Sequence, residues 1–419
     1  MATQPPPLAK PVSVLFTHFG DDWIRGSERC LLDLLSHLDR RRFHPLVWCN
    51  SPAMARAVEA LGIRVYRSDF SLLLGWSRPR LDVRAFYRQV RQGIALVDEH
   101  RIQLLHANSG APSQWLNFVA RARRIPLLTH LHARYPLRDR ITLGLHQASF
   151  SVGVSQPVVD NLLQDGIARQ RTRLIPNGID IQRLRSAPCV DLRARLKLQA
   201  GDFLLASTGS LIERKGMDLL IRAVERLLAQ GVPAHLAVIG DGPERERLVR
   251  LAERLGIAGH VHFLGEQANV MGLLKGNADV FVSGAREEVF GLVLAEAGAA
   301  SLPVVAPRVG GIPEVVEHGV TGLLVEPESP GQIAQALQGL FASPHTRARM
   351  GEAGRLRVQQ LFTIERNVRQ FEALYQQLLH DPGMHAGWLG RWQIARVLWR
   401  AIRRVFALSV SSLGREALQ

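Results

Sequence analysis

Two carboxylates in the second half of the chain have the type and spacing needed to hold a sugar. Glu288 and Glu296 lie on either side of the pair Phe290 and Gly291, where a run of good helix formers begins. A carboxylate accepts hydrogen bonds from neighbouring hydroxyl groups, such as those of a ribose or a hexose. Free N–H groups at the start of a helix attract phosphate. The pattern therefore predicts a site for a sugar phosphate, although two glutamates alone would more often be solvated surface charges.

The segments on either side of these glutamates have the pattern of alternating strands and helices. Residues 280–282 are an apolar run, residues 283–289 a polar loop, and residues 304–306 a second apolar run after the helical stretch. This order predicts strand, loop, helix and strand, which is a parallel βαβ unit. In such units the loop after the strand faces the ligand crevice.

The motif E-x-F-G-x-x-x-x-E at residues 288–296, with Pro-Val-Val at 303–305, resembles the donor-binding signature of the retaining glycosyltransferases of family 4. Residues 204–325 resemble that family almost continuously. The resemblance implies that Glu296 binds the ribose hydroxyls and that Glu288 orients the sugar hydroxyls. It also implies that Lys215 stabilises the departing diphosphate. The helix start at Phe290, Gly291 and Leu292 would assist Lys215 in this role.

Two positions depart from the family pattern. In the motif G-R-L-x-x-x-K-G, Lys215 matches the lysine, but Ser210 replaces the arginine, and Arg214 is the candidate to substitute for it. In the motif G-G-x-E-R near the start of the chain, Arg25 replaces the first glycine and Gly26 keeps the second. Arginine binds two oxygens at once, whereas lysine carries a single charge, so half of the family's positive charge around the diphosphate is either missing or rearranged.

Residues 127–132 form an apolar stretch that ends in histidines. The carboxyl ends of strands line the crevice of α/β folds. The resemblance places His132 near the transferred sugar, whereas without it a core or surface histidine is equally expected. We expect His130 to point to the opposite side of the strand.

The length of 419 residues predicts two domains. We expect an α/β protein with the GT-B fold: two Rossmann-like domains that face a central cleft, with a last helix that crosses back to the first domain. The expected divisions are an acceptor domain (1–180), a linker (181–201), a nucleotide-sugar donor domain (202–362), a crossover helix (363–380) and a basic amphipathic tail (381–419).

The excess of positive charge lies in the first half of the chain and in its tail. Residues 1–180 hold 24 Lys and Arg against 14 Asp and Glu, and residues 380–419 hold 6 against 2. Few aromatic residues and no nucleic-acid motif argue against a nucleic-acid partner. An anionic membrane surface fits better, through the tail with its one-sided arginines Arg396, Arg400, Arg403 and Arg404. Arg84, Arg88 and Arg91 predict a second basic helix face, which is either solvated or directed at a membrane or acceptor.

No apolar run approaches the length of a transmembrane helix, and the start of the chain lacks the pattern of a secretory signal. Three scattered cysteines predict neither a disulfide framework nor a metal site. We therefore expect a cytoplasmic protein, bound peripherally to the inner face of the cell membrane.

The function expected is transfer of a sugar from a UDP- or GDP-sugar to a glycan or lipid-linked acceptor with retention of configuration, in the synthesis of a cell-surface polysaccharide or glycolipid. No Asp-x-Asp motif is present, so we expect no metal and no cofactor. The alternatives are a nucleotide-sugar epimerase or phosphorylase on the same fold and a non-catalytic relative. The departures at Arg25 and Ser210 leave the last of these open.

Overall fold

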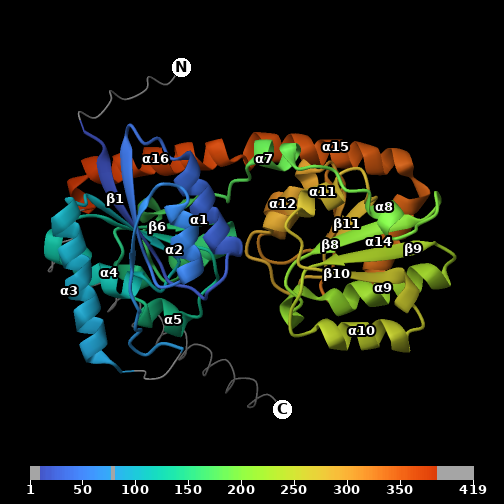
Figure 1. Ribbon diagram of the computed structural model, residues 1–419, viewed down its shortest axis with the longest axis horizontal. Coiled ribbons are helices and arrows are strands. Elements are labelled where there is room, and N and C mark those ends of the chain that lie inside the picture. The colour runs from blue at the N-terminus through green and yellow to red at the C-terminus, as the bar shows by residue number, and fades with distance from the viewer. Residues whose placement is uncertain (1–9, 77–80, 385–419) are drawn as a thin grey trace, which may run out of the picture. The chain divides into compact units, whose positions relative to one another are not determined.

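The computed structural model describes residues 10–76 and 81–384 (Figure 1). The chain divides into two compact units. Unit 1 contains residues 1–176 and 367–419, and unit 2 contains residues 177–366. Each unit is built on one parallel sheet, which confirms the expected α/β class with two Rossmann-like domains.

Unit 1 contains a seven-stranded parallel sheet with the order β3-β2-β1-β4-β5-β6-β7. Its strands are β1 (Val12–His18), β2 (Phe43–Cys49), β3 (Arg64–Arg67), β4 (Leu104–Asn108), β5 (Leu127–Leu131), β6 (Phe150–Gly153) and β7 (Thr172–Leu174). The central strands β4 and β5 are fully buried and mostly apolar because helices cover both faces of a parallel sheet. The order reverses between β1 and β4, which makes this point the topological switch of the sheet.

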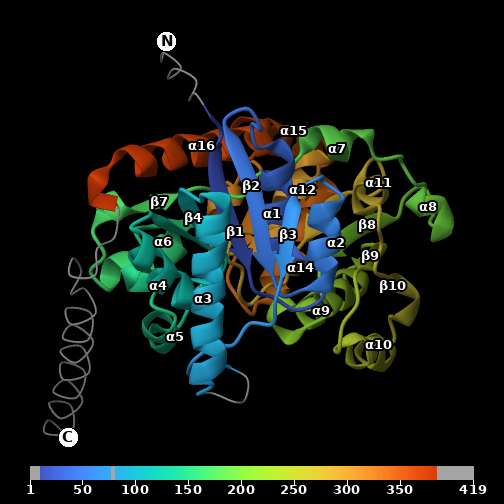
Figure 2. The same ribbon diagram turned by 60° about the vertical axis from the view of Figure 1, so that its left-hand side comes forward.

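The helices of unit 1 follow the strands in alternation. They are α1 (Gly26–His37), α2 (Pro52–Glu59), α3 (Val83–His100), α4 (Ser113–Arg123), α5 (Leu137–Thr142) and α6 (Gln156–Gln164), with short 3-10 turns η1 (Leu145–Gln147) and η2 (Arg169–Arg171). Helices α3 and α4 lie side by side, as Figure 2 shows. Gly93 of α3 allows this approach, because a Cβ there would lie 2.8 Å from Val119 of α4.

Unit 2 contains a six-stranded parallel sheet with the order β10-β9-β8-β11-β12-β13. Its strands are β8 (Phe203–Thr208), β9 (Ala234–Ile239), β10 (Val261–Gly265), β11 (Val280–Val282), β12 (Val304–Pro307) and β13 (Gly322–Val325). The switch of this sheet lies between β8 and β11, whose registers place Val280 beside Leu205. The predicted strand, loop, helix and strand of residues 280–306 is therefore central to the sheet.

The helices of unit 2 are α7 (Ile181–Ser186), α8 (Leu192–Arg195), α9 (Met217–Ala229), α10 (Arg245–Arg254), α11 (Val270–Leu274), α12 (Leu292–Ala299), α13 (Ile312–Val315), α14 (Pro330–Ala342) and α15 (Pro344–Leu361), with 3-10 turns η3 (Glu213–Lys215) and η4 (Ala258–His260). Several begin as sequence signals require. Ser329 and Ser343 cap α14 and α15 with their side chains, and a proline follows each cap.

Residues 181–201, expected as a linker, lie within unit 2 and include α7 and α8. Asn277 fixes this segment by accepting a hydrogen bond from Leu192 N and donating one to Val190 O. The last long helix, α16 (Ile364–His380), contributes its residues from Asn367 onward to unit 1. Phe371 and Tyr375 of this helix are completely buried in the core of unit 1.

The described part of α16 is followed by the 3-10 turn η5 (Pro382–Met384). The amphipathic tail predicted for residues 381–419 lies outside the described residues from position 385 onward. Within residues 10–76 and 81–384, the helices are too short or too polar to cross a membrane. Cys30, Cys49 and Cys189 form no disulfide.

Candidate functional site

The predicted donor residues of unit 2 lie on the loops that follow β8 and β11, the two strands that flank the topological switch. Lys215 lies in η3 after β8, and Glu288 lies in the loop between β11 and α12. Although these residues are far apart in the sequence, Lys215 Nζ lies 2.6 Å from Glu288 Oε2. Both side chains are largely buried, at 18% and 14% exposure.

This pair places a cation and a hydrogen-bond acceptor at one point. The amine suits a phosphate oxygen, and the carboxylate suits a sugar hydroxyl. The second carboxylate oxygen of Glu288 accepts a hydrogen bond from Val289 N at 3.2 Å, which fixes the orientation of the group. The geometry therefore suits the junction between a sugar and a phosphate.

Helix α12 begins directly after this pair. Its N-cap is Gly291, with φ of 98°, and no side chain caps the helix. The first N–H groups of a helix have no partner inside it and carry the positive end of the helix dipole. Leu292 opens the helix, and Phe290 is buried before it, at 3% exposure, against Phe362. Glu296 lies in the second turn of α12 and is half-buried.

Glycines let the loops of this edge touch through their backbones. A Cβ on Gly310, in the loop after β12, would lie 1.8 Å from the carbonyl oxygen of Glu288. The next residue, Gly311, donates its N–H to that same oxygen at 3.0 Å. The backbone of Glu288 is thus held from the loop of a third strand.

Arg214 contacts the loop that carries Glu288. Its side chain is exposed and donates to the Glu287 carbonyl at 3.3 Å, while Ser210 lies in the loop directly after β8. The expected substitution of Arg214 for an arginine at position 210 therefore stays a prediction.

The sequence reasoning missed Arg286, which joins the two loops that carry Lys215 and Glu288. Arg286 binds both carboxylate oxygens of Asp218, at 2.9 and 3.0 Å, and donates to the Glu213 carbonyl at 2.8 Å. Burial alone would raise the pKa of Asp218, but the hydrogen bond and charge of Arg286 outweigh it and lower that pKa. A lone arginine in a polar loop carries no sequence signal of such a bidentate contact.

In unit 1, His132 lies just after β5 in a chain of polar side chains. Its Nε2 is 3.0 Å from Asn108 Oδ1, at the end of β4. Asn108 Nδ2 is 3.0 Å from His18 Nδ1, at the end of β1, and His18 Nε2 is 3.0 Å from Glu28 Oε1. Two members of this chain, His18 and Asn108, thus lie at the topological switch of the first sheet.

The electrostatics of this cluster favour a neutral His132 and an ionised Glu28. Burial lowers the pKa of His132 to about 3, with a smaller contribution from His18. Burial would raise the pKa of Glu28, but the hydrogen bond and charge of His18 lower it to about 2. Burial also lowers the pKa of His106 to about 3, and its Nδ1 lies 2.7 Å from the Tyr375 hydroxyl of α16.

The prediction that His130 points away from His132 was wrong. Their ring centroids are 4.0 Å apart, because residues two apart in a strand share one face. His130 is buried at 3% exposure, and neither of its ring nitrogens has a hydrogen-bond partner among the described residues. It also contacts the ring of Phe371, so this histidine belongs to the core.

Gly26 is the first residue of α1 and is exposed, with open space where a Cβ would lie. Arg25 is the N-cap of this helix, and its backbone N–H donates to Glu28 Oε2 at 3.2 Å. The Arg25 guanidinium lies over the ring of Trp23, 4.2 Å from its centroid. Arg25, which stands where the family has a glycine, thus caps the helix that carries Glu28, the residue that contacts His18.

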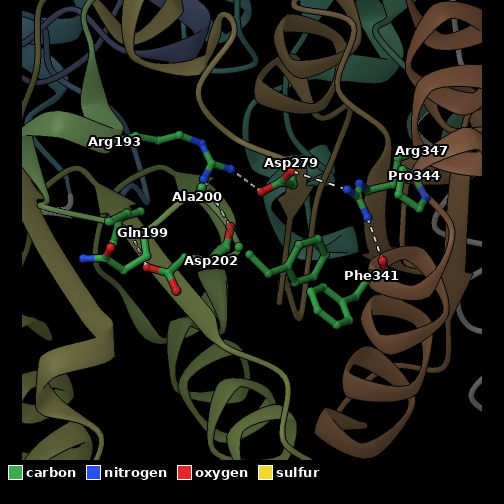
Figure 3. A pocket seen from close by; sticks show the side chains of 11 residues that line it. Arg193, Gln199, Ala200, Asp202, Asp279, Phe341, Pro344 and Arg347 are labelled. Carbon is green, nitrogen blue, oxygen red and sulfur yellow. Dashed lines mark hydrogen bonds and ion pairs between the residues drawn. The ribbon is translucent and has the colours of Figure 1, made fainter.

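A hollow of about 440 Å³ lies at the opposite edge of the sheet of unit 2, beside the start of β8 (Figure 3). Arg193 contacts Asp279 at 2.5 Å, and Arg347 approaches the same carboxylate at 3.7 Å. Because these charges are paired and the amino ends of parallel strands do not form the ligand crevice, we assign the hollow a structural role. Within residues 10–76 and 81–384, His, Cys, Asp and Glu side chains form no group of three or more that could hold a metal ion.

Comparison with known families gives two matches that together span most of the chain. Residues 191–357 match the model of glycosyl transferases group 1, and residues 24–183 match the model of glycosyltransferase family 4.

Similar proteins include a GDP-mannose-dependent α-(1-6)-phosphatidylinositol monomannoside mannosyltransferase of Mycobacterium tuberculosis. It is 31% identical over 356 residues, which cover 79% of this chain and 89% of the relative. The N-acetyl-α-D-glucosaminyl L-malate synthase of Bacillus anthracis is 28% identical over 298 residues, which cover 68% of this chain and 77% of that protein.

Solved structures share the fold. The Anabaena protein HepE in complex with UDP matches with a TM-score of 0.76 and 25% identity, over 87% of this chain and 100% of HepE. A glycosyltransferase from Rickettsia africae matches with a TM-score of 0.78 and 17% identity, over 88% of this chain and 99% of that structure.

Proposed function

The chain belongs to glycosyltransferase family 4, and from this premise we propose that it transfers a sugar from a nucleotide sugar to a glycan or lipid-linked acceptor with retention of configuration. The fold of its relatives confirms the expected GT-B architecture. The observation that carries the proposal is the contact of Lys215 Nζ with Glu288 Oε2 at 2.6 Å, beside the uncapped start of α12.

In the proposed reaction, the bond between the anomeric carbon and the diphosphate oxygen breaks, and the acceptor hydroxyl oxygen binds that carbon on the same face. The acceptor proton passes to the leaving phosphate oxygen, so no separate protein base is needed. Lys215 and the N–H groups at Gly291 and Leu292 stabilise the negative charge that grows on the diphosphate. Glu288 accepts hydrogen bonds from sugar hydroxyls, and Glu296 from the ribose.

We propose that this transfer needs no metal, because a fixed amine and a helix N-terminus supply positive charge where the diphosphate departs. Transfer in the presence of EDTA is expected to match transfer without it. A rate restored only by added Mg²⁺ or Mn²⁺ would contradict this part of the proposal.

We propose that the donor is a UDP- or GDP-sugar. HepE was solved with UDP, and the mycobacterial relative is GDP-mannose-dependent, so both bases occur among similar proteins. That relative acts on a phosphatidylinositol monomannoside. By analogy, we propose a phosphorylated lipid acceptor, as used in glycolipid or polysaccharide synthesis at the inner face of the cell membrane.

One surface of unit 1 supports peripheral membrane binding. Near the start of α3, Leu81, Val83 and Tyr87 are 68%, 61% and 61% exposed, and Arg84 and Arg88 are exposed among them. Apolar side chains beside arginines suit the interface of an anionic bilayer, because the apolar groups insert while the charges meet the headgroups.

The test combines binding with transfer. A thermal-shift screen of UDP- and GDP-sugars identifies the donor, because a ligand that binds only the folded state raises the melting temperature. The radiolabelled donor is then incubated with a lipid extract. Label in a new lipid supports transfer, label only in a changed nucleotide sugar indicates an epimerase, and no turnover of a bound donor indicates a non-catalytic relative.

A further inference from the structure

The turn that carries Lys215 has little support of its own. This turn, η3, is three residues long, Glu213–Lys215, and no side chain caps its start. Lysine has a flexible four-carbon side chain, so its amine reaches a fixed point only if the turn itself is held. The contacts that hold η3 come from the loop between β11 and α12, which also carries Glu288.

The two loops touch through a pair of glycines. A Cβ on Gly216 would lie 1.9 Å from the carbonyl oxygen of Gly284, and a Cβ on Gly284 would lie 2.2 Å from the carbonyl oxygen of Gly216. Gly216 also has φ of 60°, which favours glycine. Close backbone packing brings the loops together, and polar contacts are then needed to fix their orientation.

Arg286 supplies polar contacts on both sides of Lys215. Its backbone N–H donates to the Arg214 carbonyl at 2.9 Å. Its side chain donates to the Glu213 carbonyl at 2.8 Å and binds the two carboxylate oxygens of Asp218 at 2.9 and 3.0 Å. Because Glu213 precedes Lys215 and Asp218 follows it, the guanidinium brackets the turn that carries the lysine.

A third loop of unit 2 also contacts Arg286. Glu328, in the loop after β13, places its Oε1 2.6 Å from Arg286 Nε and its Oε2 3.2 Å from Arg286 Nη2. The backbone of Glu328 has φ of 56°, a left-handed conformation that residues other than glycine rarely adopt. Such strain persists where the surrounding structure holds it, and it is concentrated at functional sites.

These contacts leave the Arg286 guanidinium no N–H group for a ligand. Arginine carries five N–H donors, one on Nε and two on each terminal nitrogen. Nε contacts Glu328, Nη1 contacts Glu213 and Asp218, and Nη2 contacts Asp218 and Glu328. Two carboxylates also outweigh its single positive charge, so Arg286 is suited to ordering the loops and not to binding a phosphate.

We infer that Arg286 is a positioning residue for the proposed sugar transfer. By holding turn η3 against the loop of Glu288, it fixes the Lys215 amine where the diphosphate of the nucleotide sugar leaves. The inference rests on the proposed function. Arg286 acts through Lys215 and does not contact the substrate.

The direct test observes Lys215 without nucleotide or acceptor. The sequence contains four lysines, so a spectrum of the full-length protein labelled with ¹³C at the lysine ε carbon has few signals. The Lys215 signal is identified by its loss in Lys215→Ala. We expect it to lie away from the signal of the exposed Lys197 and to move toward that signal in Arg286→Gln. A signal that stays in place would overturn the inference, whether or not sugar transfer is detected.

Arg355→Gln is the matched control. The side chain of Arg355 is 29% exposed, close to the 24% of Arg286, and it likewise binds the two oxygens of one carboxylate, that of Glu352. Because Arg355 and Glu352 both lie on α15, we expect their separation to leave the Lys215 signal in place. An equal movement in the two variants would show a non-specific effect and would refute the positioning role.

A double-mutant cycle supplies the readout that a purely structural role would not change. With the donor found in the screen, Arg286→Gln is expected to lower kcat by about 10-fold, because a small displacement of a group at the reacting bond slows the reaction. In Lys215→Ala, the same change is expected to lower kcat by less than about 2-fold, because the residue through which it acts is already lost. Equal losses in the two backgrounds would refute action through Lys215.

Arg286→Lys extends the test to the case in which glutamine prevents folding. Lysine keeps the charge but has three donors in place of five, so it is expected to move the Lys215 signal in the same direction and to lower kcat by about 3-fold. A Lys215 signal and a rate equal to those of wild type would overturn the inference. If wild type itself transfers no sugar, the proposed function fails, and the spectrum alone decides whether Arg286 positions Lys215.

Discussion

Lys215 and Glu288 illustrate how tertiary contact gives meaning to single residues. Each is an ordinary charged side chain in the sequence, yet the structure places their charged atoms 2.6 Å apart in a largely buried position. An amine held against a carboxylate can exchange that partner for a diphosphate when a ligand arrives. Of the single side chains, we therefore expect these two to matter most for activity.

Replacement of Lys215 by alanine is expected to lower kcat by about 100-fold to 1000-fold, because it removes a charge that acts on the leaving group. Steady-state transfer with the screened donor measures the effect. Lys197→Ala is the control, since Lys197 is an exposed lysine of the same unit. Equal rates in the two variants would refute the role of Lys215.

The buried histidines predict an acid sensitivity of unit 1. Burial lowers the pKa of His106 to about 3 from its ordinary value of 6.5, so the unfolded chain binds a proton that the folded chain does not. Proton uptake by the unfolded chain therefore lowers the free energy of unfolding as the pH falls from 6.5 toward 3, and it has no effect above pH 6.5.

For His106→Phe, the loss of unfolding free energy between pH 7 and pH 5 is therefore expected to be about 2 kcal/mol smaller than in wild type. Urea unfolding followed by tryptophan fluorescence measures this, because Trp48 and Trp115 are completely buried in unit 1. The comparison cancels the constant cost of losing the Tyr375 contact. The same pH dependence in both proteins would contradict the buried neutral state.

At the scale of elements, the helices differ in what they present. Helix α12 begins without a side-chain cap, and we propose that its first N–H groups bind an anion. Helix α3 begins with exposed apolar side chains and exposed arginines, while Phe86 on the same helix is buried against the unit. One helix therefore suits a ligand, and the other suits a surface.

Replacement of Arg84 and Arg88 by glutamate is expected to weaken binding to vesicles of phosphatidylglycerol and phosphatidylcholine by at least about 10-fold, because each arginine near an anionic surface contributes about 1 kcal/mol. Sedimentation with vesicles measures the bound fraction. Arg247→Glu with Arg250→Glu, on the exposed side of α10, is the matched control. Similar losses in both double variants would indicate a non-specific charge effect.

At the scale of the whole molecule, the basic excess at both ends of the chain predicts that more than one segment contacts the membrane. Residues 380–419 hold 6 Lys and Arg against 2 Asp and Glu. Deletion of residues 385–419 is expected to move the protein from the membrane fraction to the supernatant after cell lysis. Unchanged recovery with membranes would leave α3 as the sole candidate surface.

A finer version of this experiment keeps the length of the chain. Glutamine at Arg396, Arg400, Arg403 and Arg404 removes the charge of one predicted helix face and preserves its helix-forming character. The same shift to the supernatant is expected. A shift on deletion that the glutamine variant does not reproduce would assign the effect to apolar residues of the tail.

The sequence alone determined the alternation of strands and helices. The apolar run at 280–282 is a strand with those bounds, and the run at 304–306 lies in β12, because buried parallel strands are rich in apolar residues. It also identified Lys215, Glu288 and the helix start at Leu292, because a motif of fixed spacing records a local geometry. The roles assigned to these residues remain predictions.

Only the tertiary structure brought residues of different strands together. Lys215 contacts Glu288, and Asn108 contacts both His132 and His18, because the carboxyl ends of neighbouring parallel strands share one edge of a sheet. Strand order across a switch is decided by packing of the whole sheet. No local pattern at Arg286 or Asn108 indicates which residues of other loops they contact. Their contacts were therefore found only in the folded chain.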